Sequence, residues 1–138
     1  MIRGVNHIGI VVTNIEEAIR LYTEAFGFHL TQPVTMIPEL GIKDAIVSTG
    51  EVAFEIMESV ASDKPIGRFL ERHGEGLHHI SLDVDDVNET LRSLTQKDIS
   101  LINKEAISFG GVLVASIHPR STRGVMIELI QTAKTDEH

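Results

Sequence analysis

One stretch of sequence decides the fold, and it occurs twice. The first copy reads His7-Ile-Gly-Ile-Val-Val-Thr-Asn-Ile-Glu-Glu-Ala-Ile-Arg20, and the second reads His79-Ile-Ser-Leu-Asp-Val-Asp-Asp-Val-Asn-Glu-Thr-Leu-Arg92. A shift of 72 residues aligns the two copies, so that His7 meets His79 and Arg20 meets Arg92. Self-similarity at a fixed spacing indicates two structurally equivalent modules.

Each copy predicts a strand followed by a helix. The β-rich runs span residues 4–12 and 77–84. Asn14 and Asp86 follow them as helix N-caps, each with a glutamate three residues later, which is the capping-box arrangement. Apolar residues then recur at helical spacing, and Gly27 and Lys97-Asp98 end the two helices.

After each helix the β pattern returns. Strands are expected near 28–36, 42–49 and 52–58 in the first copy, and at 99–104, 112–118 and 124–131 in the second. The ends also match, at an offset of 73, where Val52-Ala-Phe-Glu-Ile-Met57 falls on Val125-Met-Ile-Glu-Leu-Ile130. The fold class is therefore α+β, with two tandem β-α-β-β-β modules. Between them a short connector helix is expected, capped by Ser62 or Asp63, with Pro65 in its first turn and Gly74 at its end.

The repeat places residues that can bind a metal at equivalent points. Each copy has a histidine on its first strand, His7 or His79, and a glutamate on its last strand, Glu55 or Glu128. A single strand histidine or glutamate is usually structural or exposed, but matched pairs of both favour a shared site. His78 competes with His79, and only one of these strand neighbours can face the site. The repeat selects His79.

Two imidazoles and two carboxylates with open positions suit a divalent ion such as Co²⁺, Mn²⁺, Ni²⁺ or Zn²⁺. The chain has no cysteine, so thiolate sites and disulfides are excluded. The net charge of −8 argues against nucleic acid as a partner. No signal-peptide pattern and no apolar run of membrane-spanning length occur, so a cytoplasmic protein without a membrane partner is expected.

Several motifs resemble those of the methylmalonyl-CoA epimerase family, in the vicinal oxygen chelate (glyoxalase/bleomycin-resistance/dioxygenase) superfamily. The motifs cover almost the whole chain in order: Val5-Asn-His-Ile-Gly-Ile10, Pro38-Glu-Leu-Gly-Ile42, Lys64-Pro-Ile-Gly-Arg-Phe-Leu70, Gly74-Glu-Gly-Leu-His-His-Ile80, His118-Pro-Arg-Ser121 and Gly124-Val-Met-Ile-Glu-Leu129. The resemblance implies a glyoxalase-like fold, a curved mixed sheet around the metal site. The length of the chain predicts a single domain over residues 1–138, and the repeat divides it into modules at about 1–58 and 77–131 with a connector at about 59–76.

The implied activity is that of an isomerase, which epimerises methylmalonyl-CoA at C2 through an enolate. A metal would stabilise that enolate, and two carboxylates on opposite faces of C2 would exchange the proton. The family pattern makes Glu128 both a ligand and one base. The second base is Asp44 or Glu39, and the family also allows a glutamine at the position of Glu55.

Three other functions share this fold: a glyoxalase I-like lyase acting on a glutathione hemithioacetal, a non-haem iron dioxygenase and a non-catalytic drug-binding protein. A fourth ligand at Glu55 argues against the dioxygenase, whose iron typically has three protein ligands. The scarcity of aromatic residues, five Phe, one Tyr and no Trp, argues against the drug-binding protein. The expected partners are an acyl-CoA substrate and a second copy of the chain in a homodimer. The sequence leaves open the native metal, the contacts to the CoA phosphates and the dimer geometry.

Overall fold

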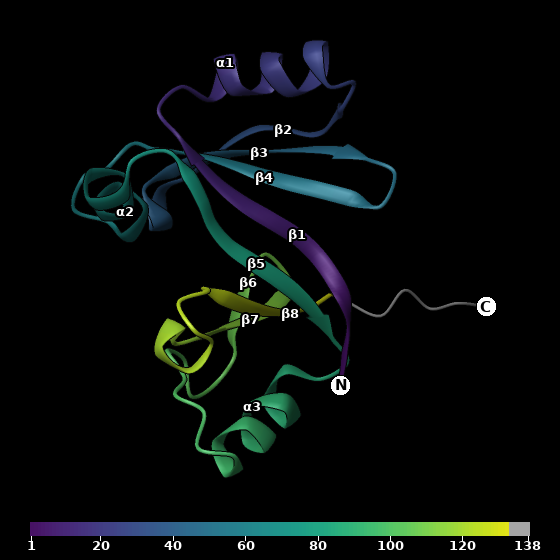
Figure 1. Ribbon diagram of the computed structural model, residues 1–138, viewed down its shortest axis with the longest axis vertical. Coiled ribbons are helices and arrows are strands. Elements are labelled where there is room, and N and C mark those ends of the chain that lie inside the picture. The colour runs from purple at the N-terminus through teal and green to yellow at the C-terminus, as the bar shows by residue number, and fades with distance from the viewer. Residues whose placement is uncertain (133–138) are drawn as a thin grey trace. The chain divides into compact units, whose positions relative to one another are not determined.

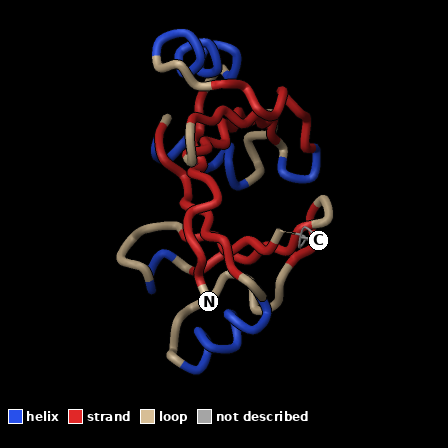
Figure 2. The backbone as a smooth tube through the Cα atoms, turned by 90° about the vertical axis from the view of Figure 1, so that its right-hand side faces the viewer, coloured by secondary structure: helices blue, strands red, loops and turns tan. Residues whose placement is uncertain are grey.

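The computed structural model describes residues 1–132 and confirms the two β-α-β-β-β modules (Figure 1). The first module comprises β1 (Ile2–Val12), α1 (Ile15–Arg20), β2 (His29–Ile37), β3 (Ile42–Thr49) and β4 (Val52–Ser59). The second comprises β5 (Gly76–Val84), α3 (Val87–Gln96), β6 (Ile107–Phe109), β7 (Val112–Ile117) and β8 (Ile127–Gln131). Helix α2 (Pro65–His73) is the connector, a π-helical turn (Leu21–Ala25) extends α1, and 3-10 turns occupy Pro38–Leu40 and Pro119–Ser121. Figure 2 shows these helices and strands along the backbone.

The strands form one mixed sheet with the order β2-β3-β4-β1-β5-β8-β7-β6. In each module the first strand pairs in parallel with the last, β1 with β4 and β5 with β8. The remaining strands of each module add on in antiparallel fashion. The strands of the first module follow one another outward as β1, β4, β3 and β2, and those of the second as β5, β8, β7 and β6. The two modules therefore have the same strand order, as the repeat requires.

The helix starts are built alike in the two modules. Asn14 Oδ1 accepts the backbone N–H of Glu17, and Asp86 Oδ1 accepts that of Glu89, each at 3.0 Å. Both predicted N-caps are confirmed, and each satisfies an amide that the first helical turn leaves without a partner. The last strand also contributes, because Glu58 accepts the N–H of Ile15 and Gln131 accepts the N–H of Val87.

On one face of each module's sheet, an apolar core lies beneath the helix of that module. In the first module α1 covers a cluster around Ile10, Val12, Ile15, Ala45, Val47 and Ile56. In the second module α3 covers Val84, Val87, Leu91, Ala115, Ile117 and Leu129. Strand residues alternate between faces, so the residues between these core positions lie on the opposite face of the sheet. His7, Glu55, His79 and Glu128 belong to that opposite face.

The connector helix α2 packs on the opposite face of the first module. It packs Ile66, Phe69 and Leu70 against a cluster that contains Val11, Ile42 and Met57. Pro65 stands in the first turn and Gly74 at the C-cap, as expected. The predicted caps Ser62 and Asp63 are wrong: the N-cap position is Lys64, whose side chain makes no capping bond.

The sequence misplaced one strand of the second module. Residues 99–104 do not form a strand but a loop, with a single bridge between Leu101 and Ile117. The Asn103 side chain accepts the N–H of Ser116, so it takes a β7 donor that a neighbouring strand would need. Strand β6 lies further along, at Ile107–Phe109. Strand β8 begins at Ile127 instead of residue 124, because the preceding turn includes Gly124 at φ 91°.

The chain divides into two compact units. One comprises His7–His78, and the other comprises Met1–Asn6 with the residues from His79 onward. Each boundary falls inside a strand, β1 or β5. A single domain over residues 1–138 stays a prediction, and residues 133–138 lie outside the described residues. Within residues 1–132, none of the helices has the length and apolar character to cross a membrane.

Candidate metal centre

The first module brings His7 and Glu55 together through the register of β1 and β4. Gly9 stands opposite Glu55, and His7 precedes Gly9 by two residues, so both side chains point to the same face. His7 Nε2 lies 3.6 Å from Glu55 Oε1. The two side chains are 12% and 20% exposed, so the pair is largely shielded from water.

The second module repeats this arrangement. Ser81 stands opposite Glu128 in the pairing of β5 and β8, and His79 precedes Ser81 by two residues. The Ser81 hydroxyl donates a hydrogen bond of 3.0 Å to Glu128 Oε1. Ser81 is fully buried and His79 is 8% exposed.

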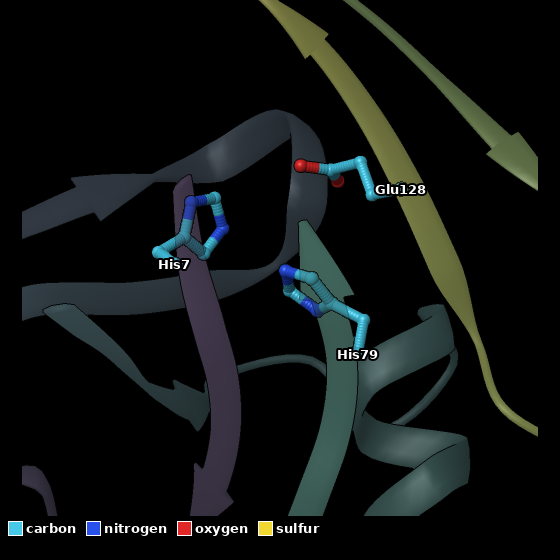
Figure 3. Close-up of side chains that lie close together, drawn as sticks. All are labelled: His7, His79 and Glu128. Carbon is cyan, nitrogen blue, oxygen red and sulfur yellow. The ribbon is translucent and has the colours of Figure 1, made fainter. Parts of the chain in front are cut away.

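His7, His79 and Glu128 each offer one ligand atom, and these three atoms lie within 4.8 Å of one another (Figure 3). Two imidazoles and a carboxylate are donors suited to a borderline divalent ion. The residues present therefore fit such an ion, and the carboxylate of Glu55 lies beside His7.

His78 has a different environment from that of its neighbour. Its ring meets that of Phe69 on α2 edge to face, with the centroids 4.9 Å apart. Burial lowers the pKa of the His78 imidazole, against an opposing effect of the Glu55 charge. The contact with α2 gives His78 a packing role.

Asp44 is buried beside Glu55. It is 4% exposed and lies on β3, two residues from Ile46, the partner of Glu55 on β4. Gln32 Nε2 donates a 3.1 Å hydrogen bond to Asp44 Oδ1. Burial raises the pKa of Asp44 to about 7, helped by the hydrogen bond and charge of Glu55 and opposed by Gln32 and the charge of His7.

Glu39, the other candidate for the second base, has a contrasting position. It lies on the exposed 3-10 turn Pro38–Leu40 that precedes β3. Glu39 is exposed, whereas Asp44 is buried beside Glu55, a candidate ligand.

Sequence reasoning missed two polar partners, Gln32 and Ser81. Gln32 lies on β2, where the register with β3 shifts, and the sequence alone does not place it near Asp44. Ser81 gave a signal, because it replaces Gly9 in an otherwise similar stretch of the repeat. Gly9 lies opposite Glu55 and Ser81 lies opposite Glu128, so at this position only Glu128 has a hydroxyl group beside it.

Comparison with known proteins identifies the superfamily. Residues 6–116 match the model of the glyoxalase/bleomycin resistance protein/dioxygenase superfamily. The match includes His7, Glu55 and His79 and ends before β7 is complete.

A more specific likeness comes from individual relatives. Mitochondrial methylmalonyl-CoA epimerase of Bos taurus is 33% identical over 128 residues, which cover 91% of this chain and 73% of that protein. The structure of a hypothetical protein from Bacillus halodurans C-125 superimposes with a TM-score of 0.90 at 32% identity, over 97% of each chain. A methylmalonyl-CoA epimerase in complex with methylmalonyl-CoA and NH4+ has the same fold, with a TM-score of 0.89 at 23% identity over the full length of both chains.

The superfamily match covers most of the chain, and the relative from Bos taurus is similar over nearly all of it. The predicted glyoxalase-like fold is confirmed by the superpositions. The chain therefore belongs to the glyoxalase/bleomycin resistance protein/dioxygenase superfamily and, within it, to the methylmalonyl-CoA epimerase family.

Proposed function

We propose that the protein is an isomerase that interconverts the two C2 epimers of methylmalonyl-CoA with the help of one divalent metal ion. The observation that carries this is the grouping of His7, His79 and Glu128 in a chain of the epimerase family. The acyl-CoA substrate is inferred from the relatives, which are named for it.

We propose four ligands for the metal, namely His7, Glu55, His79 and Glu128. The support for Glu55 is its contact with His7 and its repeat equivalence to Glu128. When bound, the ion would act as a Lewis acid and stabilise the negative charge that develops on the thioester oxygen as C2 loses its proton. The donor set accepts Co²⁺, Mn²⁺, Ni²⁺ or Zn²⁺, and the choice among them stays open.

The proton is moved by carboxylates of this chain. Inversion at carbon requires removal of a proton from one face and delivery to the other, so two groups are needed. We assign one face to Glu128 and the other to Asp44. Asp44 is favoured over Glu39 because it is buried beside Glu55, whereas Glu39 lies on an exposed turn. Gln32 holds the Asp44 carboxyl through its amide.

Three further expectations stay predictions. The whole chain would act as one domain, with modules at about 1–58 and 77–131 and a connector at about 59–76. It would assemble into a homodimer, and it would be located in the cytoplasm.

The function is tested by deuterium wash-in at C2 of methylmalonyl-CoA in heavy water, followed by NMR with and without a chelator. The proposal predicts fast exchange that the chelator abolishes and a divalent metal restores. Absence of exchange with every one of the four metals would refute it. A parallel assay with the glutathione hemithioacetal of methylglyoxal tests the glyoxalase I-like alternative, for which no turnover is expected.

A further inference from the structure

Ser81 places a buried hydroxyl group on β5, between the apolar residues Ile80 and Leu82. It is fully buried, and its Oγ donates a hydrogen bond of 3.0 Å to Glu128 Oε1. A buried hydroxyl costs free energy unless it is hydrogen-bonded. Glu128 supplies the acceptor, so the stability of this polar group depends on the carboxylate beside it.

The repeat provides an internal comparison. At the equivalent point of the first module stands Gly9, opposite Glu55 in the same register. Glycine has no side chain, so this position gives Glu55 no hydroxyl donor. The same strand pairing therefore forms with or without the hydroxyl. The donor distinguishes the surroundings of Glu128 from those of Glu55.

The hydrogen bond constrains what the carboxylate can do. A carboxylate rotates about its last torsion with little preference, and a fixed donor on Oε1 selects one orientation. The bond occupies one lone pair of Oε1. Donors of this kind hold ligating carboxylates in place, and their loss typically weakens metal binding or activity.

We propose that Ser81 is a positioning residue for Glu128, whose carboxylate it orients for metal binding and for proton transfer at one face of C2. The inference rests on the proposed function, since that function gives Glu128 both roles. In this proposal Ser81 acts through its hydrogen bond to Glu128.

The first test is Co²⁺ binding to the metal-free protein, measured by calorimetry, which does not depend on activity. Ser81→Ala should weaken the affinity about 10–100-fold. Ser81→Gly gives the second module the same residue type that Gly9 provides in the first module, and it should weaken the affinity to the same extent. Ser116→Ala is the matched control. Like Ser81, Ser116 is a serine that lies opposite Glu128 on a neighbouring strand, here β7, and the substitution also removes one hydroxyl group. That variant should keep the parental affinity.

The second test separates positioning from a general structural effect. Deuterium wash-in is measured from each pure epimer of methylmalonyl-CoA at saturating Co²⁺. Ser81→Ala should slow exchange from the epimer whose proton faces Glu128 more than exchange from the other. A merely structural defect would slow both equally.

The outcomes distinguish this inference from the proposed function. If Ser81→Ala and Ser81→Gly fold and bind Co²⁺ with parental affinity, or slow both epimers equally, the inference is overturned. If the parental protein does not exchange the C2 proton but Ser81→Ala still weakens Co²⁺ binding, the proposed function falls and the orienting role toward the metal ligand stands.

Discussion

At the scale of the residue, the site depends on the alternation of side chains along a strand. His78 and His79 are neighbours, yet His78 packs on Phe69 while His79 lies with His7 and Glu128. A shift of one residue in the register of β5 would exchange their roles. The identity of the histidine is therefore a direct check on the arrangement.

We predict that His79→Ala loses most of its metal affinity and that His78→Ala retains it. The reason is that the first substitution removes a ligand and the second removes a packing contact with α2. Metal content per chain after dialysis, measured by atomic emission, decides between them. Retention of the metal by His79→Ala together with its loss from His78→Ala would show that the wrong histidine has been assigned.

We predict that Asp44→Asn impairs epimerisation by about 10²–10⁴-fold, the usual contribution of a general acid or base. One epimer should still exchange its C2 proton with solvent, because Glu128 continues to serve its face. Glu39→Gln is the comparison variant and should behave like the parent, since Glu39 is on an exposed turn. The assay is NMR in heavy water with each pure epimer. Parental rates in Asp44→Asn with metal retained would remove Asp44 from the mechanism.

Sequence reasoning proposed the candidate ligands because each has a repeat partner, and the ligand set stays a prediction. It gave no comparable assignment where no repeat partner exists. Asp44 and Glu39 could not be separated from the sequence, since burial decides between them and burial depends on strand pairing. Gln32 was missed for the same reason. Its contact with Asp44 depends on the irregular register between β2 and β3.

At the scale of the element, the connector helix α2 requires a glycine where it approaches the preceding loop. A Cβ at Gly67 would lie 2.5 Å from the carbonyl oxygen of Ala61 and 2.8 Å from Ser59 Oγ. A backbone carbonyl cannot move aside as easily as the end of a flexible side chain. Helix α2 or the preceding loop would therefore have to shift, which would disturb the packing of α2 on the cluster of Val11, Ile42 and Met57.

We predict that Gly67→Ala lowers the free energy of unfolding by about 1–3 kcal/mol, the usual cost of overpacking. Gly4→Ala is the matched control, because a Cβ at that position would meet no atom within 4 Å. Urea denaturation of both variants measures the difference. Equal stability of the two would mean that α2 does not pack as closely on Ala61 as described.

The elements themselves were predicted well where a hydrophobic pattern and a cap coincide, and poorly where one was missing. Both N-caps and the order of elements in both modules are confirmed. The strand expected at 99–104 contained apolar residues in the right proportion, but the Asn103 side chain bonds to the backbone of β7. Such local competition between a side chain and the backbone does not show in the spacing of apolar residues along the sequence.

At the scale of the whole molecule, the duplicated module gives each half of the chain one apolar face and one face with polar groups. Buried imidazole and carboxylate groups cost stability unless they are paired or bound to a metal. We therefore predict that a metal stabilises the folded protein. At a free metal concentration one hundred times the dissociation constant, the gain is about 2.7 kcal/mol.

Thermal unfolding of the metal-free protein with and without added Co²⁺ measures this gain as a rise in the transition temperature. His7→Ala should show a much smaller rise, because it lacks one of the clustered ligands. An equal rise in the parent and in His7→Ala would indicate that the stabilising ion binds elsewhere.

One divalent ion bound at the cluster of His7, His79 and Glu128 would give the protein its epimerase activity. The most direct measurement is the rate of epimerisation of methylmalonyl-CoA by the metal-free protein, titrated with Co²⁺ at a protein concentration far above the dissociation constant. We predict a negligible rate without metal, then a linear increase that ends sharply at one ion per chain. A metal-free protein that epimerises at the full rate, or an increase that ends at a different stoichiometry, would contradict the claim.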